Sequence, residues 1–479
     1  MTLDALIRAL APSEVAGGRP VEIADLAYDT RAVSAGALFF CVPGARADGH
    51  ELAWEAIEQG AAALVVERPL EVDVPQLVVQ STREAMAVAA DVFFGEPTKE
   101  LEVAGVTGTN GKTTTAFLLR GILEAAGRRP GLVGTVEWRV GGEAREAPFT
   151  TPEAIDLQRL FREMLQRGDR SAAVEASSHG SALRRLDRVR FDALVFTNLS
   201  QDHLDLHGTM EEYFDAKRRL FTGAAPPPAA VCVDDEWGRR LAHDLEDAHR
   251  APLVTFGLSD GAEVRPEKLV LDASGSRFRT AGIEIETALR GRFNVLNALG
   301  AVAAGLLLEV DEDEIADGIA SVQGVPGRFE AIDEGQPFAV VVDYAHTPDS
   351  LASVLDAARD LARGRVLVVF GAGGDRDRGK RPLMGRVAAE RADVTIVTSD
   401  NPRSENPLAI IQDVLQGTGV EVEIDPDRRS AIHRAVELAR DGDVVVIAGK
   451  GHEQGQDVGG VVSPFDDREV AREALRGRR

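Results

Sequence analysis

The segment LEVAGVTGTNGKTTT, residues 101 to 115, contains the residues best suited to chemistry in this chain. An apolar strand pattern leads into a turn with two glycines, and a lysine and three threonines then open a helical run. The free N–H groups and the positive dipole end of a helix N-terminus favour anions, so a polyphosphate fits this arrangement. Lys112 would neutralise the outer phosphates, and the hydroxyl of Thr113 or Thr114 would bind Mg²⁺. The alternative is a glycine-rich turn that only joins strand to helix, but it leaves the Lys-Thr pair unexplained.

Two polar clusters follow later strand candidates, at residues 172–176 and 193–197. Glu175 and the Ser-Ser-His after it close the first strand, and a run that contains His203 follows the second. In a mostly parallel sheet such carboxyl ends share one edge, where ligands gather. Carboxylates are the usual Mg²⁺ ligands and histidine is a less typical one, so both side chains are metal-ligand candidates. The alternatives are an N-cap-like contact for Glu175 and a hydrogen-bonded loop position for His203; the phosphate loop favours the metal hypothesis.

Lys217 lies on a predicted helix at residues 210–221. Helical periodicity alone predicts no more for it than a solvated ion pair, for example with Asp215 or Glu212.

Composition limits the class of protein. The chain has 479 residues, 44% of them hydrophobic, so two to four ordered domains are expected rather than disorder. A net charge of −24 argues against DNA or RNA as a partner. Two distant cysteines argue against a disulfide framework or a zinc site, and the sequence pattern predicts neither a signal peptide nor a membrane-spanning run. A soluble cytoplasmic protein is therefore expected.

The chain alternates strand and helix patterns throughout, which predicts an α/β fold in three domains. These are an N-terminal substrate domain at 1–98, a central P-loop-type ATPase domain with a mostly parallel sheet at 99–327, and a C-terminal Rossmann-like α/β domain at 328–479. Further strands are predicted at 36–42, 62–66, 76–79, 229–233, 252–256, 338–342, 365–370, 394–398 and 443–448. Further helices are predicted at 51–59, 83–94, 154–167 and 311–322.

Loops rich in turn formers and charge add candidate sites at both ends of the chain. Residues 28–31 and 43–49 combine turn formers with arginine, which suits phosphate or sugar recognition, although exposed turns with surface ion pairs would look the same. In the C-terminal domain, four loops follow the carboxyl ends of predicted strands and together indicate a ligand site. They lie at 343–348, 371–378, 400–403 and 449–453.

Taken in order, these segments resemble the Mur ligase family, the three-domain, ATP-dependent amino-acid-adding enzymes of peptidoglycan synthesis. The resemblance rests on TGTNGKTT, EASSH, TNLSQDHLDLHG, GRFNVLNALG, PGRFE, DYAHTPDS, GGDRDRGKRPLM, DNPR and GKGHE, which extend over nearly the whole chain. Within the family the chain is most similar to the members that add meso-diaminopimelate as the third peptide residue.

The resemblance implies a role for each matching residue. Lys112, Lys217, Glu175 and His203 would be catalytic, and Thr113, Glu175, His203 and Lys217 would hold magnesium. Lys217 would carry a carbamate formed from CO₂, which replaces the ion-pair interpretation. ATP would lie on Gly108, Thr109, Asn110, Gly111, Lys112, Thr113, Thr114, Asn297, Arg328 and Asp343. The UDP-sugar peptide would contact Tyr28, Thr30, Ala45, Arg46, Ala47, Thr150, Thr151, Ser177 and Arg185. Diaminopimelate would contact Arg376, Asp400, Asn401, Pro402, Arg403, Gly449 and Glu453.

The second ammonium–carboxylate centre of diaminopimelate distinguishes it from lysine. Arg403 can hold the far carboxylate in a bidentate fork, and Glu453 can accept the far ammonium group. The expected reaction joins meso-diaminopimelate to UDP-N-acetylmuramoyl-L-alanyl-D-glutamate through an acyl phosphate, in a monomer that binds neither nucleic acid nor membrane. The alternatives are a lysine-adding homologue, a folylpolyglutamate synthase, or a nucleotide-binding module without ligase activity.

Overall fold

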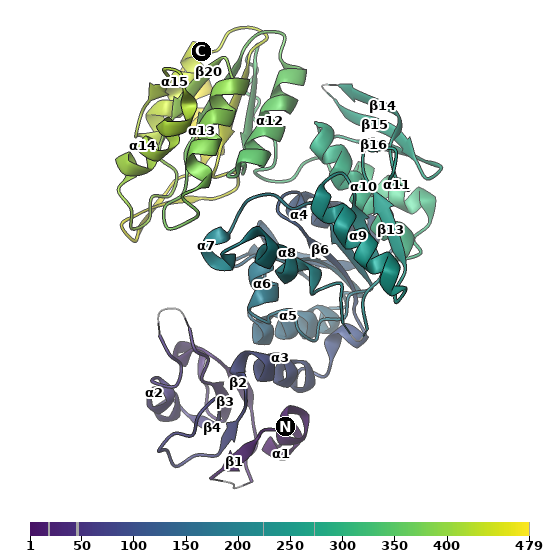
Figure 1. Cartoon of the computed structure of the whole chain (residues 1–479), viewed down its shortest axis with the longest axis vertical. Helices are drawn as coiled ribbons and strands as arrows, with labels where there is room; N and C mark the ends of the chain where they lie inside the picture. Colours follow the sequence, from purple (N-terminus) through teal and green to yellow (C-terminus); the bar gives the residue numbers. More distant parts are fainter. Residues whose placement is uncertain (18–19, 45–46, 224, 273, 479) are drawn as a thin grey trace. The chain divides into compact units, whose positions relative to one another are not determined.

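The computed structural model describes residues 1–17, 20–44, 47–223, 225–272 and 274–478 (Figure 1). They form two compact units, Met1–Gly105 with Arg128–Asp192, and Val106–Gly127 with Ala193–Arg479. Helices alternate with mostly parallel strands in both units, which confirms the predicted α/β class. No helix in the described part of the chain combines the length and hydrophobicity that crossing a membrane requires.

The first unit begins with a five-stranded sheet in the order β1-β5-β4-β3-β2, parallel except at β1. Its elements are α1 (Leu3–Leu10), β1 (Glu14–Ala16), β2 (Asp25–Ala27), η1 (Thr30–Ala32), β3 (Ala37–Phe40), α2 (Ala53–Glu58), β4 (Ala61–Val66), β5 (Gln76–Val78), α3 (Thr82–Phe93) and η2 (Pro97–Lys99). Successive side chains point to opposite faces of a strand. Phe40 of β3 therefore packs with α1 and α3, whereas Phe39 packs with α2.

The largest sheet has eight strands in the order β13-β12-β11-β6-β10-β7-β8-β9. In the first unit β10 is parallel to β7, and β7, β8 and β9 form an antiparallel meander that the sequence patterns had not predicted. The elements of this part are β6 (Glu102–Thr107), β7 (Pro130–Val133), β8 (Glu137–Val140), β9 (Glu143–Glu146), α5 (Ala154–Gln166), β10 (Ser171–Glu175) and α6 (Ser178–Ala182).

In the second unit, β11, β12 and β13 run parallel, and α10 packs against all three. The elements here are α4 (Lys112–Ala125), β11 (Ala193–Phe196), α7 (Leu204–His207), α8 (Met210–Arg218), β12 (Ala229–Cys232), α9 (Glu236–Ala248), β13 (Leu253–Phe256), α10 (Arg292–Leu307) and α11 (Glu312–Ser321). An antiparallel sheet of β14 (Glu267–Asp272), β15 (Gly275–Thr280) and β16 (Ile283–Thr287) had not been predicted. Buried and exposed residues alternate along β16, which is the pattern of a strand with one face buried.

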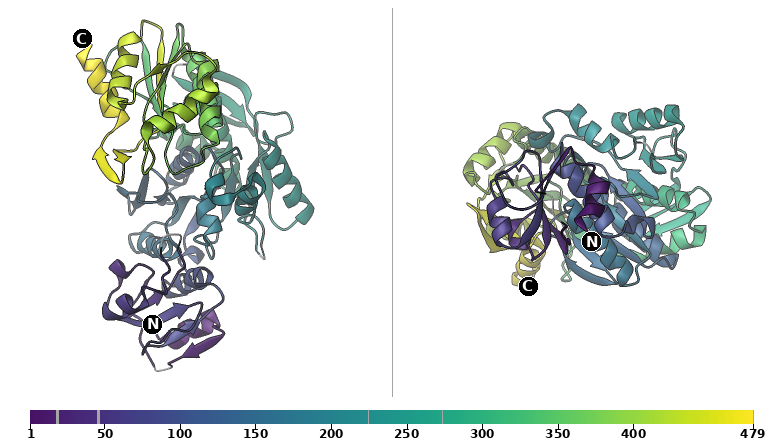
Figure 2. Two further views of the ribbon diagram at one scale, coloured as in Figure 1. Left: turned by 60° about the vertical axis from the view of Figure 1, so that its left-hand side comes forward. Right: turned by 90° about the horizontal axis from the view of Figure 1, so that it is seen from below.

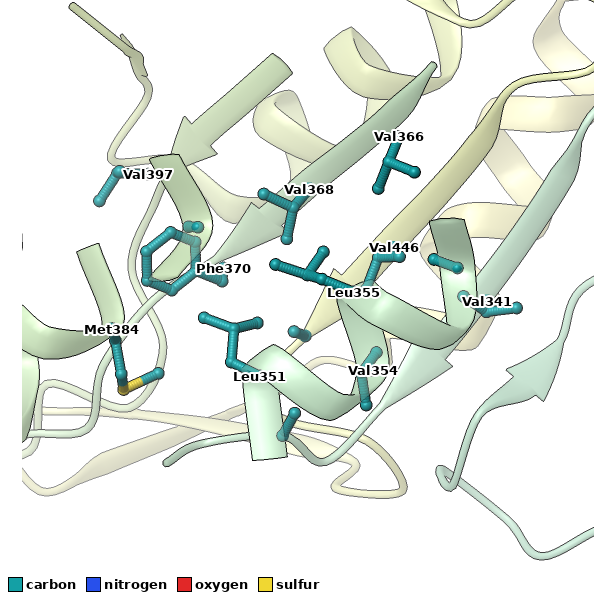
Figure 3. Close-up of a cluster of buried hydrophobic side chains, with 14 of the residues drawn as sticks. Val341, Leu351, Val354, Leu355, Val366, Val368, Phe370, Met384, Val397 and Val446 are labelled. Atoms are coloured by element: carbon teal, nitrogen blue, oxygen red, sulfur yellow. The ribbon is translucent and has the colours of Figure 1, made fainter. Parts of the chain in front are cut away.

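The last sheet has the order β17-β18-β22-β19-β20-β21 and is parallel except at β17. Helices α12, α13 and α14 cover one face, where Leu351 and Leu355 meet Val368 and Phe370 (Figure 3). Helices α15 and α16 cover the other face. The strands are β17 (Glu330–Ala331), β18 (Ala339–Asp343), β19 (Val366–Phe370), β20 (Val394–Val397), β21 (Glu423–Ile424) and β22 (Val444–Ala448). The helices are α12 (Pro348–Leu361), α13 (Lys380–Arg391), α14 (Pro407–Thr418), α15 (Arg428–Leu438) and α16 (Asp467–Gly477).

Strands β18, β19 and β22 are runs rich in valine that are buried on both faces, as expected for the centre of a parallel sheet. Side chains at the N-termini cap the helices that follow: Thr347 forms a capping box for α12, and Asp427 and Asp466 cap α15 and α16. A hairpin of β23 (Gly455–Val458) and β24 (Val461–Pro464) projects beside this sheet, in yellow in Figure 2.

Candidate active site

The predicted strand–turn–helix at residues 101–115 is confirmed as β6, a glycine loop and α4. Gly108 has φ 145° and Gly111 has φ 87°, values at which a side chain would be strained. A Cβ added to Gly108 would collide with the hydroxyl of Thr197, and one added to Gly111 would collide with the carboxamide of Asn297. Only glycine therefore fits these two positions, and the loop can present its backbone at the start of a helix.

Lys112 lies against this loop. Its Nζ donates hydrogen bonds to the carbonyl oxygens of Gly108 and Thr109, at 3.0 and 2.8 Å. Neighbouring side chains fix the loop from the other side. The N–H of Asn110 donates to Asn198 Oδ1 at 2.9 Å, and Thr197 Oγ1 donates to the carbonyl of Asn110 at 2.6 Å. The result is a rigid backbone cradle with a positive charge and a helix N-terminus, which fits a bound polyphosphate.

Lys217 is buried, with 1% of its surface exposed, so the solvated ion pair predicted from periodicity alone is wrong. Its Nζ donates to the carbonyl of Gly108 at 2.8 Å and lies 4.6 Å from the ring centroid of Tyr213. Helix α8 positions it, and the capping box of Thr209 at the helix start uses Glu212, one of the expected ion-pair partners. Burial, followed by the charge of Lys112, holds the pKa of Lys217 well below its usual value. The fold therefore favours the neutral form of this amine.

His203 belongs to a cluster of charged side chains in the second unit. Its Nε2 lies 3.4 Å from Asp202 Oδ2, and His346 Nε2 lies 3.5 Å from the same oxygen. Lys380 Nζ donates to Asp202 Oδ1 at 3.0 Å, and both of these side chains are 5% exposed. Burial alone would raise the pKa of Asp202, but the hydrogen bond from His346 and the nearby positive charges hold it well below its usual value. Sequence reasoning had not singled out Asp202, Lys380 or His346, although each lies in a motif that carries the family resemblance.

Arg328 and Asn297 also lie at the glycine loop. Arg328 Nη2 donates to Thr113 Oγ1 at 2.9 Å, and its guanidinium stacks 4.5 Å from the ring centroid of Tyr344.

Asp343 forms hydrogen bonds with backbone groups. Its carboxylate accepts hydrogen bonds from the N–H groups of Phe329 and Ala345, at 2.6 and 2.7 Å, and burial raises its pKa. Asp343 thus fixes the backbone beside Arg328, and its predicted nucleotide contact remains a prediction.

Thr113 and Thr114 are buried at the start of α4. The hydroxyl of Thr109 is tied to its surroundings, since it accepts from the N–H of Ser200 at 3.0 Å and lies 3.1 Å from the hydroxyl of Tyr213.

In the first unit, Glu175 ends β10 and is 1% exposed. Oε1 accepts from the N–H of Thr135 at 2.7 Å, and Oε2 accepts from the hydroxyl of the same residue at 3.0 Å. The hydroxyl of Thr150 lies 3.0 Å from that of Thr135. Hydrogen bonds from Thr135 therefore fix the carboxylate of Glu175 at the carboxyl end of β10, and Glu175 is not an N-cap.

The predicted substrate residues of this unit gather around the same strand end. Thr151 Oγ1 donates to the carbonyl of Glu175 at 2.7 Å and accepts from the N–H of Ser177 at 3.1 Å. Arg185 Nη1 donates to the carbonyl of Thr151 at 2.9 Å, and Nη2 lies 2.8 Å from Glu153 Oε1. Thus Thr150, Thr151, Ser177 and Arg185 are brought together.

Tyr28 and Thr30 lie beside β2. The hydroxyl of Tyr28 donates to Asp156 Oδ2 at 2.7 Å, and burial together with that bond raises its pKa. Thr30 is buried in η1, and Ala47 is exposed. Ala45 and Arg46 lie outside the described residues.

In the C-terminal sheet, two of the predicted loops are linked by hydrogen bonds. Asn401 Nδ2 donates to Glu453 Oε2 at 2.7 Å, and Lys450 Nζ donates to Asn401 Oδ1 at 3.0 Å and to Glu453 Oε2 at 3.2 Å. Gly449 allows the carboxylate of Asp400 to approach, because a Cβ at that position would collide with it. Sequence reasoning had not identified Lys450, which is completely buried.

Arg403 and Arg376 flank Gly373. A Cβ built on this glycine would lie 3.1 Å from Arg403 Nη1 and 3.9 Å from Arg376 Cγ. Arg403 is half-buried and donates from Nη1 to the carbonyl of Gly374 at 2.6 Å, whereas Arg376 is exposed. The hairpin of β23 and β24 holds Arg403 from the other side, since the N–H of Arg403 donates to the carbonyl of Asp457 at 3.0 Å. Two arginines therefore lie beside one loop, and a guanidinium group can bind a carboxylate through two parallel hydrogen bonds.

The family models match consecutive parts of the chain: the Mur ligase family catalytic domain at residues 22–103, the Mur ligase middle domain at 106–305 and the Mur ligase glutamate ligase domain at 327–451. The chain belongs to the Mur ligase family. Among its relatives are proteins named UDP-N-acetylmuramoyl-L-alanyl-D-glutamate–2,6-diaminopimelate ligase. That of Solibacter usitatus is 47% identical over 98% of this chain and 96% of the relative. That of Geobacillus kaustophilus is 47% identical over 96% of each.

Solved structures agree with this membership of the Mur ligase family. A structure of a UDP-N-acetylmuramoyl-L-alanyl-D-glutamate–2,6-diaminopimelate ligase is 33% identical and covers 95% of both chains, with a TM-score of 0.68. A MurF ligase of Thermotoga maritima in complex with ADP is 19% identical, covers 95% of this chain and 98% of its own, and has a TM-score of 0.66. The second likeness is one of fold.

Proposed function

We propose that this Mur ligase joins meso-diaminopimelate to UDP-N-acetylmuramoyl-L-alanyl-D-glutamate at the expense of ATP. The choice of amino acid rests on one observation above all. Arg403 and Glu453, the two groups suited to the far end of diaminopimelate, lie on loops that Asn401 links by a 2.7 Å hydrogen bond. Lysine has no far carboxylate for Arg403 to bind.

ATP fits the glycine loop, because its backbone cradle has no room for side chains and Lys112 brings positive charge to it. Gly108, Thr109, Asn110, Gly111, Thr113, Thr114, Asn297, Arg328 and Asp343 remain the proposed nucleotide contacts. The carboxylate of the UDP substrate would attack the γ-phosphorus, so that an acyl phosphate forms and ADP leaves. The amine would then attack the acyl carbon, phosphate would leave, and the amine proton would go to solvent or a nearby base.

A magnesium ion is implied by the nucleotide. Among the described residues no three His, Cys, Asp or Glu side chains are grouped to hold a metal by themselves. Magnesium usually takes one or two carboxylates together with phosphate oxygens and waters, and the buried carboxylate of Glu175 and the hydroxyl of Thr113 suit that role. Thr113, Glu175 and His203 are the proposed ligands. When bound, the ion would supply positive charge to the transferring phosphoryl group.

Lys217 is proposed to carry a carbamate. Burial lowers the pKa of its amine and so favours the neutral form, and only a neutral amine can form a bond to the carbon of CO₂. The amine loses one proton in that step, and the product is an anion that can take part in binding magnesium.

Several finer points stay proposals. These are domain limits at 98/99 and 327/328, a cytoplasmic location, a monomeric state, and contacts of the UDP substrate with Tyr28, Thr30, Ala45, Arg46, Ala47, Thr150, Thr151, Ser177 and Arg185. Contacts of diaminopimelate with Arg376, Asp400, Asn401, Pro402, Arg403, Gly449 and Glu453 belong to the same group.

The test is ATP-dependent phosphate release with UDP-N-acetylmuramoyl-L-alanyl-D-glutamate and either meso-diaminopimelate, L-lysine or no amine. Wild type is compared with Arg403→Ala and with Arg378→Ala, an exposed arginine that pairs with Glu405. Stimulation by diaminopimelate alone, lost only in Arg403→Ala, is the expected result. Stimulation by lysine would replace the proposed amine, and the absence of any stimulation would favour a nucleotide-binding module.

A further inference from the structure

Arg428 has a completely buried side chain at the start of α15, and it forms a fork with Asp467, which is also completely buried. Its Nε donates to Asp467 Oδ1 at 2.7 Å and its Nη2 to Oδ2 at 2.6 Å. The pair lies at the carboxyl end of the C-terminal sheet, and neither side chain reaches solvent. It was not among the residues that the sequence marked as functional.

The same guanidinium donates to two backbone carbonyls. Nη2 donates to the carbonyl of Ala448 at 2.9 Å, and Nη1 donates to that of Ser399 at 3.3 Å. These carbonyls directly precede Gly449 and Asp400, where the two proposed diaminopimelate-binding loops begin.

The strands that lead into these loops are not neighbours. In the sheet order β22-β19-β20, strand β19 separates them, so no ladder of hydrogen bonds joins β20 to β22. Strands two places apart lie nearly 10 Å from each other, roughly twice the spacing of paired strands. Arg428 spans this interval with one rigid, planar group, and Asp467 fixes the orientation of its plane.

Contacts between the two loops depend on their separation. The bond of Asn401 to Glu453 and the bond of Lys450 to Asn401 connect the loops directly. A change of even 1 Å would break such bonds or move the acceptor Glu453 relative to Arg403.

We propose that Arg428, oriented by Asp467, is a positioning residue that sets the distance between the loops at 400–403 and 449–453 and thereby the selectivity for the amino acid. The inference rests on the proposed function, because it assigns these loops to the second charged centre of diaminopimelate. A purely structural role would instead lower stability without changing the discrimination between amines.

The test uses Arg428→Lys, which keeps the positive charge but cannot reach two carbonyls and a carboxylate with one planar fork. Its matched control is Arg365→Lys. Arg365 pairs with Asp443 and donates to the carbonyl of Leu438, at the amino ends of strands in the same sheet. Phosphate release is measured against the concentration of each substrate, with melting temperatures recorded for all variants.

For Arg428→Lys we expect the KM for diaminopimelate to rise at least tenfold and its preference over lysine to fall, while the KM for ATP stays within twofold. Arg365→Lys is expected to leave both KM values within twofold. If Arg428→Lys does not fold, Asp467→Asn, which removes the charge that orients the guanidinium, is expected to give the same change. Unchanged KM and preference in the variant that folds would overturn the inference.

Wild-type turnover with diaminopimelate tests the proposed function separately. A crystal structure of Arg428→Lys gives a readout that does not depend on the amine. The bond from Asn401 to Glu453 is expected to lengthen beyond hydrogen-bonding distance, and an unchanged bond would overturn the positioning role even if the enzyme used another amino acid.

Discussion

Replacing Lys217 by methionine is expected to stabilise the folded chain at neutral pH and to abolish ligation. The Lys217 amine is buried, and its pKa is lowered by burial and by the charge of Lys112. Methionine has a similar length and no charge, so it can fill the same space. The substitution removes the hydrogen bond from Lys217 Nζ to the carbonyl of Gly108, which contributes about 1 kcal/mol to the stability of the fold.

The size of the effect follows from proton linkage. In the unfolded chain Lys217 has its usual pKa of 10.5 and binds a proton, whereas in the folded chain it is neutral above its lowered pKa. Between these two values the unfolded state holds one more proton, so wild-type stability rises with pH by about 1.4 kcal/mol per unit. The methionine variant lacks this term. Its advantage in free energy of unfolding should therefore shrink by about 1.4 kcal/mol per pH unit as the pH rises from that lowered pKa toward 10.5.

The assay is urea unfolding of both proteins across this pH range in buffer free of CO₂, because a carbamate would stabilise only the wild type. A second series with added bicarbonate should raise the melting temperature of the wild type and leave the variant unchanged. Phosphate release in the presence of all substrates should be lost in the variant. A difference in unfolding free energy that does not change with pH would mean that Lys217 is protonated in the folded chain, and the reasoning would be refuted.

Three further substitutions test other parts of the site. Gly108→Ala should weaken binding of a non-hydrolysable ATP analogue, measured by calorimetry, at least about tenfold, because the new Cβ collides with Thr197. Asp202→Asn should lower the free energy of unfolding by about 3 kcal/mol, since Lys380 is left buried without a countercharge. Because the pKa of Asp202 is lowered in the folded chain, the stabilisation that its carboxylate contributes is present at neutral pH. This stabilisation is lost as the pH falls through the lowered pKa. Arg185→Ala should raise the KM for the UDP substrate about tenfold and leave that for ATP unchanged.

Each of these substitutions has a control in the same chain. Gly261→Ala places a Cβ in open space, Asp260→Asn breaks an exposed ion pair, and Arg184→Ala removes an arginine next to the proposed substrate contact. Equal effects in variant and control would contradict the explanation given for that position. Wild-type affinity for the ATP analogue in Gly108→Ala would show that the loop does not hold the nucleotide.

Much of the fold follows from local patterns. Apolar runs predicted β18, β19, β20 and β22 of the C-terminal sheet but not its short strands β17 and β21, and helical periodicity placed α3, α5 and α11 to within a few residues. The meander after β7 and the sheet of β14, β15 and β16 were missed, because short strands that are only partly buried give a weak signal.

The candidate site, like the fold, could be predicted from the sequence only in part. The order of glycine, lysine and threonine at 108–114 was enough to predict a phosphate loop, because the chemistry of such a loop is contained in one short segment. Lys217 could not be understood in this way, since its neighbours on the helix predict a solvated ion pair. Only tertiary structure buries its amine against Gly108. Arg428 gave no signal at all, although its guanidinium joins strands that lie far apart in sequence. A sequence records the period and polarity of each segment, but the burial and partners of a charge depend on which distant segments meet.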